Sequence, residues 1–136
     1  LRQYARALDD PRYETSFLNL WSVMESLTLT GLARYDETTT RAAMVFSDSD
    51  YIRMLLSALR KERNALVHTD ARLEAAETSM YQLKSVVDGL LRFWFGAARR
   101  LRSEAEVQMF LQLPPAALTL KRRKTVLDAA IRYRRG

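Results

Sequence analysis

The clearest indication of the fold class comes from the segment Phe17-Leu18-Asn19-Leu20-Trp21-Ser22-Val23-Met24-Glu25-Ser26-Leu27. Its large apolar residues recur three or four positions apart, the spacing that places them on one face of an α-helix. The whole chain of 136 residues has only four Gly and three Pro, and no extended alternation of Val, Ile and Thr that would indicate strands. We therefore expect a nearly all-α domain.

Turn-forming residues and apolar spacing divide the chain into expected helices. The first helix should end at Asp9-Asp10-Pro11, and the second should run from about Glu14 to Thr30, closed by Gly31. A third should run from about Asp50 to Val67, and a fourth, the longest, from about Arg72, after a Thr69-Asp70 cap, to Arg102. Inside the fourth, Gly89 and Gly96 suggest close packing or a bend.

Two segments are less regular. The polar stretch from Gly31 to Asp50 is expected to be a long central loop, with one or two helical turns at Ala42 to Phe46. After Pro114-Pro115, a basic segment that includes Lys121, Arg122, Arg123 and Lys124 is expected to be either a terminal helix or a frayed tail.

Length and composition indicate the class of protein. At 48% hydrophobic content, residues 1–136 suffice for one domain with one core, and because the chain opens with Leu in a helical pattern, we expect it to be the C-terminal part of a longer protein. The absence of Cys excludes disulfides and thiolate metal sites and favours a reducing compartment, so cytoplasm is expected. No apolar run approaches the roughly 20 residues of a membrane span, so no membrane partner is expected.

The charge balance is basic, with a formal net charge of +6 and a pI near 10.0. Of the 22 basic residues, 18 are Arg, whose guanidinium group can bind phosphate through two hydrogen bonds and stack on bases. This composition is typical of nucleic-acid-binding chains, although a solvated surface gives similar counts.

His68 is the only histidine, so acid–base chemistry near neutral pH would fall on it first, and multi-histidine metal centres within one chain are excluded. It ends the sequence Arg63-Asn64-Ala65-Leu66-Val67-His68. With so many Arg in the chain, this spacing alone is weak evidence.

The placement of Arg63 carries more information than the spacing. Arg63 falls in the middle of an apolar helical stripe formed by Ile52, Leu55, Leu56, Leu59, Leu66 and Val67. On the second helix, Glu25 projects into the apolar arc, where a carboxylate should be paired. Glu25 and Arg63 are natural partners, and the pair either orients the Arg or merely neutralises a buried charge. A snorkelling Arg with a surface His is the simpler alternative.

These features together resemble the HEPN superfamily, closest to its ApeA-like branch. The resemblance rests on the acidic residue in the Phe17–Leu27 helix, followed after a loop by Arg63, Asn64 and His68, and spans roughly Glu14 to Arg102. It implies a helical bundle of four or five helices. Many relatives have Gly directly after the motif His, whereas this chain has Thr69-Asp70, so the His68 geometry is open.

The resemblance further implies a metal-independent endoribonuclease without a cofactor, in which the 2′-hydroxyl of RNA attacks the adjacent phosphate. His68 would transfer a proton, Arg63 would stabilise the phosphorane, Asn64 would orient the His or the phosphate, and Glu25 would hold Arg63. An ideal helix separates Arg63 and His68 by about 140°, so a homodimer through the motif helices is expected to complete the site.

Lys121, Arg122, Arg123 and Lys124 are expected to bind RNA rather than to take part in the chemistry. By analogy with the family, the domain would be an effector of prokaryotic antiviral defence or a toxin, regulated by an N-terminal sensor outside this sequence. Two alternatives stay open. The chain could be a non-catalytic HEPN module that binds RNA, a nucleotide or a partner chain, or a plain helical interaction domain with Arg63 and Glu25 as a buried ion pair.

Overall fold

The computed structural model describes residues 1–31, 34–69 and 74–136. Within these ranges the chain forms seven α-helices and one short 3₁₀ helix, with no strand, so the all-α prediction is confirmed. The elements are α1 (Arg2–Asp9), α2 (Tyr13–Leu27), α3 (Tyr35–Met44), α4 (Ser49–Thr69), α5 (Ala76–Phe95), η1 (Ala97–Arg100), α6 (Glu104–Leu111) and α7 (Ala117–Arg135).

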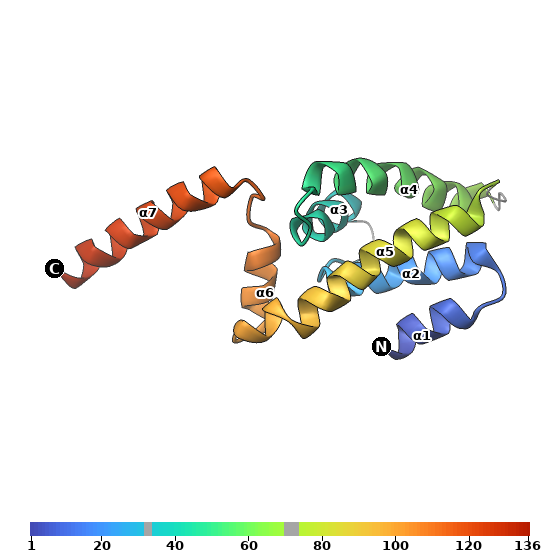
Figure 1. Ribbon diagram of the computed structural model, residues 1–136, viewed down its shortest axis with the longest axis horizontal. Coiled ribbons are helices and arrows are strands. Elements are labelled where there is room, and N and C mark those ends of the chain that lie inside the picture. Colours follow the sequence, from blue (N-terminus) through green and yellow to red (C-terminus); the bar gives the residue numbers. More distant parts are fainter. Residues whose placement is uncertain (32–33, 70–73) are drawn as a thin grey trace.

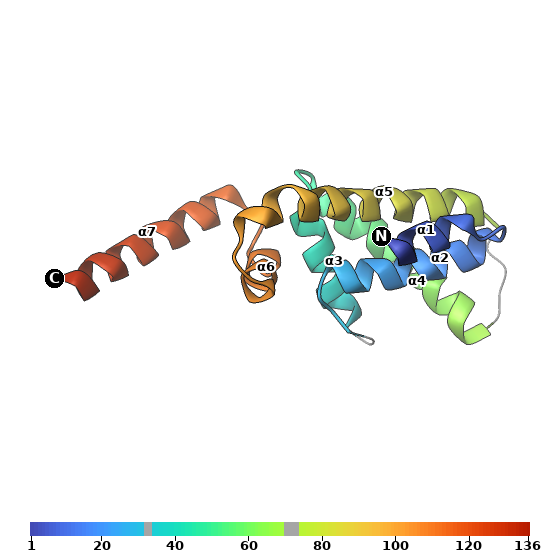
Figure 2. The same cartoon turned by 90° about the horizontal axis from the view of Figure 1, so that it is seen from below.

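The core lies between α2 and α5, which run side by side through the body of the molecule (Figures 1 and 2). From α2 the predicted apolar face is buried, with Phe17, Leu20 and Met24 fully enclosed. α1 packs on α2, and α3 packs on α4. Opposite α2, the helix α5 contributes Leu83, Val86, Val87 and Leu90.

The prediction of a long central loop is wrong, because ten residues of this segment form the helix α3. Asp36 and Glu37 lie in the first turn of α3, where negative charge favours a helix N-terminus. The threonines that made this segment look like a loop are accommodated by bonding to the preceding turn: Thr38 Oγ1 donates to Arg34 O at 3.0 Å, and Thr39 Oγ1 donates to Asp36 O at 3.1 Å.

The expected fourth helix is shorter than predicted. α5 ends at Phe95, and the Gly96 N–H closes it by donating to Arg92 O at 2.9 Å and Phe93 O at 3.2 Å. The chain then continues as η1 and α6, so the described residues hold more helices than the expected four or five. The Asp70 cap and the expected start near Arg72 lie outside the described residues.

The basic C-terminal segment is a helix, α7, rather than a frayed tail. It extends away from the bundle, beyond α6 (Figures 1 and 2), and none of its residues is buried. In the described part of the chain, no helix has both the length and the apolar character that crossing a membrane requires.

Gly89 makes the close contact that its position in α5 suggested. A Cβ atom there would lie 2.3 Å from Cζ of Phe46. We expect Gly89→Ala to lower the free energy of unfolding by about 1 kcal/mol, because overpacking costs about 1–3 kcal/mol and the better helix propensity of Ala returns about 1 kcal/mol. In a Phe46→Ala background the same change should stabilise the protein. Urea unfolding of the four proteins tests this, and an equal effect in both backgrounds would contradict it.

Candidate functional site

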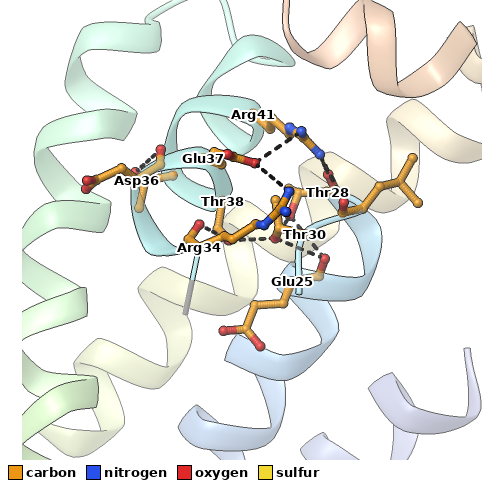
Figure 3. Close-up of polar contacts among 10 residues, drawn as sticks. Glu25, Thr28, Thr30, Arg34, Asp36, Glu37, Thr38 and Arg41 are labelled. Carbon is orange, nitrogen blue, oxygen red and sulfur yellow. Dashed lines mark hydrogen bonds and ion pairs between the residues drawn. The ribbon is translucent and has the colours of Figure 1, made fainter. Parts of the chain in front are cut away.

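A buried arginine fastens α3 to the end of α2. Arg41 is 3% exposed. Its Nη1 donates to the carbonyls of Thr28 and Leu29, at 3.0 and 2.9 Å, while Nη2 lies 3.3 Å from Oε2 of Glu37 (Figure 3). These bonds satisfy carbonyl groups at the C-terminal end of α2, where Leu29 adopts a left-handed φ of 56°. The position of α3 is therefore set by α2.

A chain of threonine hydroxyls reinforces this attachment. Oγ1 of Thr30 lies 2.9 Å from Oγ1 of Thr28 and 2.6 Å from Oγ1 of Thr38 (Figure 3). All three side chains are buried, so each hydroxyl needs such a partner. The sequence interpretation missed this cluster because its members lie in and beside the segment expected to be a loop. The Glu37–Arg41 spacing of four was the available signal.

Arg63 of α4 lies against α3. Its Nη1 donates to the Tyr35 hydroxyl at 2.6 Å and to Asn64 Oδ1 at 3.3 Å, and its guanidinium carbon lies 4.7 Å from the centre of the Tyr35 ring. Arg63 is half-buried, as its place in the apolar stripe predicted. Tyr35 was not predicted as a partner.

The apolar stripe around Arg63 is confirmed for most of its members. Ile52, Leu56 and Leu59 are buried, and Leu55 and Leu66 pack against the core. The exception is Val67, which is 49% exposed. Its assignment to the buried stripe was wrong because α4 extends beyond the core near its C-terminal end.

Glu25 is buried, at 6% exposed, and its Oε1 accepts a hydrogen bond of 3.1 Å from Trp21 Nε1. Its carboxylate points away from the Arg41–Glu37 pair (Figure 3). Burial raises the pKa of Glu25, and this outweighs the opposing effects of the Arg63 charge and the Trp21 hydrogen bond. Among the described residues no ion pair within 4.0 Å joins Glu25 to Arg63. The expected partners thus interact through their charges rather than by direct contact.

The raised pKa of Glu25 gives its effect on stability a definite sign. A carboxyl group whose pKa is raised on folding favours the fold below its ordinary value of 4.5 and loses that contribution as the pH rises through the folded-state pKa. We therefore expect Glu25→Gln to gain stability relative to wild type as the pH rises from about 4 to 7. The gain should be larger in an Arg63→Ala background, which lacks the opposing charge.

Chemical denaturation across this pH range measures the difference in the free energy of unfolding between Glu25→Gln and wild type. Glu74→Gln, which removes an exposed carboxylate, is the matched control for the loss of one negative charge. A Glu25→Gln difference that is flat, or that falls as the pH rises, would contradict the assigned direction.

His68 lies exposed in the last turn of α4, which is helical through Thr69. Five positions separate it from Arg63, which is about 7.5 Å along a helix axis and on a different side. The structure therefore brings Arg63 and Asn64 together, with Glu25 nearby, and leaves His68 apart from them within one chain.

The outer face of α4 is open to solvent and carries His68. Tyr51 and Met54 are large apolar residues on α4 that are 52% and 66% exposed. The small residues Ser57 and Ala58 are exposed beside them. Small side chains between larger apolar ones let two helices approach closely.

The other predicted RNA-binding residues lie far from the motif. Lys121, Arg122, Arg123 and Lys124 are exposed on α7, at the opposite end of the molecule from the C-terminal end of α4 (Figure 1).

Comparison of the chain with protein-family models, curated proteins and solved structures gave no match. Among the described residues, no three acidic or histidine side chains gather as they would around a metal ion.

Proposed function

We propose that this chain is a metal-independent endoribonuclease of the HEPN type. The observation that carries the proposal is the way in which the guanidinium group of Arg63 is held. Its Nη1 is anchored by Tyr35 and Asn64, and its Nη2 and Nε make no hydrogen bond in the described ranges. An arginine held by one nitrogen can offer the rest of its guanidinium fork to a phosphate. The single histidine of the chain lies five residues, or about 1.4 turns, further along the same helix.

The proposed reaction joins the 2′-oxygen of a ribose to the adjacent phosphorus and breaks the bond from phosphorus to the 5′-oxygen. One proton leaves the 2′-hydroxyl and one reaches the 5′-oxygen, giving a cyclic phosphate and a 5′-hydroxyl. His68 performs one of these transfers, and solvent water takes part in the other. Arg63 stabilises the charge on the phosphorane.

The separation of Arg63 from His68 in one chain makes a dimer part of this proposal. We expect two copies to pair through the outer face of α4, where Met54 and Ala58 are exposed and His68 follows. Pairing by a two-fold axis would place the same face on both copies, so that His68 of each copy meets the other copy.

The basic helix α7 is proposed to hold RNA. Replacing its four clustered cations by Gln should weaken RNA binding, because phosphate contacts are lost. Each lost contact should make the negative slope of log affinity against log salt shallower by about 0.7 for a single strand. Fluorescence anisotropy at several salt concentrations measures this slope. The substituted residues are Lys121, Arg122, Arg123 and Lys124.

A control variant removes three exposed cations from the other end of the chain, at Arg2, Arg6 and Arg12, and the change in slope is compared per cation removed. These changes should alter the slope less than the α7 changes. Equal changes per cation in the two variants would assign the binding to overall charge rather than to α7.

A direct assay tests the proposed activity. A labelled RNA oligonucleotide incubated with the purified domain in EDTA should be cut, whereas the same sequence with 2′-deoxy sugars should bind and stay intact, because it lacks the nucleophile. Cleavage of both, or of neither, would contradict the proposed mechanism.

One observation favours a second candidate, a non-catalytic HEPN module that binds RNA. Within one chain, Arg63 is half-buried against α3 while His68 is exposed on another side of α4. Such a module would bind the RNA oligonucleotide, lose affinity with the α7 substitutions and leave the RNA uncut. In either case, an effector role in prokaryotic defence rests on the family resemblance, and a cytoplasmic location rests on the absence of Cys.

A further inference from the structure

Tyr35 makes the shortest hydrogen bond to Arg63 and has no place in the motif. Its hydroxyl accepts from Arg63 Nη1 at 2.6 Å, and the Arg63 guanidinium carbon lies 4.7 Å from its ring centre. The hydroxyl fixes one nitrogen of the fork, and the ring attracts the positive charge. Together they restrict the directions in which the remaining N–H groups can point.

Tyr35 is itself held on a fixed element. It is the first residue of α3, its side chain packs against the core, and α3 is fastened to α2 by Arg41 and the threonine hydroxyls. A side chain that orients another must itself be held by packing and hydrogen bonds, as Tyr35 is.

A second arginine shares the ring without competing for the hydroxyl. The Arg60 guanidinium carbon lies 4.9 Å from the Tyr35 ring centre, and its Nη1 pairs with Asp36 Oδ1 at 2.7 Å. The Arg60 charge is thus directed toward Asp36, whose side chain is 94% exposed. Arg63 keeps the hydroxyl.

We propose that Tyr35 is a positioning residue that orients Arg63 toward the scissile phosphate, an inference that rests on the proposed ribonuclease function. Tyr35 does not touch the substrate in this assignment. It limits the rotation of the Arg63 guanidinium, so that the N–H groups pointing at the phosphorane are in place before the reaction begins.

Tyr35→Phe removes the hydroxyl and keeps the ring, so the fold and the attraction between ring and cation are retained. We expect kcat for RNA cleavage to fall about tenfold with KM changed less than twofold. The change removes the hydrogen bond that holds the charged Arg63 guanidinium, and Arg63 acts on the transition state. The kcat of Tyr35→Leu, which also lacks the ring, should fall further. Tyr81→Phe, at an exposed tyrosine of α5, is the matched control and should equal wild type.

A second measurement separates this inference from the proposed function. In NMR spectra of wild type without RNA, the Arg63 guanidinium signals should show slow rotation, and Tyr35→Phe should speed it while the melting temperature stays close to wild type. Fast rotation in wild type, or equal rotation in both proteins, overturns the role of Tyr35 even if RNA is cut. A third outcome is slow rotation that depends on Tyr35 in a wild-type protein that cuts no RNA. That result would keep the contact by which Tyr35 orients Arg63. It would overturn both the nuclease function and the catalytic role assigned to Tyr35.

Discussion

Replacing His68 with alanine should reduce RNA cleavage at least about 100-fold, because the change removes the one side chain of the motif that can carry a proton near neutral pH. The fold should not change, since His68 is exposed in the last turn of α4. Cleavage rates at saturating RNA, together with melting temperatures, measure both effects. Cleavage by His68→Ala at the wild-type rate would contradict the nuclease assignment.

Arg63→Ala is the companion change and should also abolish cleavage, by removing the charge that meets the phosphorane. Arg63→Lys separates charge from geometry, because Lys keeps the cation but cannot donate from a planar fork. We expect Lys to recover little of the activity. If Arg63→Ala unfolds the domain, then the contacts of Arg63 with Tyr35 and the charge of Glu25 explain the residue structurally, and the Lys variant decides the catalytic question.

Mixing the two inactive variants should restore activity. If a site takes Arg63 from one copy and His68 from the other, a mixed dimer of Arg63→Ala and His68→Ala keeps one complete pair. With random exchange half of the dimers are mixed, so about a quarter of the wild-type activity should return. Neither variant alone should show it.

The dimer itself provides the control for this experiment. Light scattering at tens of micromolar protein, an ordinary range for dimer dissociation, should give the mass of two chains. Ala58→Arg on the outer face of α4 should give a monomer, since a charged side chain in a close helix contact is costly. A mixture that stays inactive although the variants exchange subunits would contradict the shared site.

The sequence predicted the parts of the fold that depend on local spacing. The buried face of α2 and the end of α1 at Asp9 follow from apolar periodicity and from Pro11. Most of α3 was missed because its buried residues Thr38, Thr39 and Arg41 give no apolar signal, and only Ala42 and Ala43 lie in the helical turns that were expected. Their burial depends on a network with α2 that no single segment reveals.

The candidate site, like the fold, was predicted only in part. The burial of Arg63 and Glu25 followed from their places in apolar stripes. Their mutual arrangement did not, because Tyr35, from a helix that the spacing did not predict, occupies the hydrogen-bonding position expected for Glu25. The side-chain register on α4 correctly separated Arg63 from His68, since α4 is a regular helix through both.

The chemistry of the cut ends tests the central claim most directly. Mixed cellular RNA incubated with the purified wild-type domain in EDTA should yield fragments with 2′,3′-cyclic phosphates and 5′-hydroxyls, because the attacking oxygen is the RNA's own. End-specific ligation and sequencing identify both groups. Fragments that carry 5′-phosphates and 3′-hydroxyls, or RNA that stays intact, would contradict the assignment of Arg63 and His68 as a ribonuclease site.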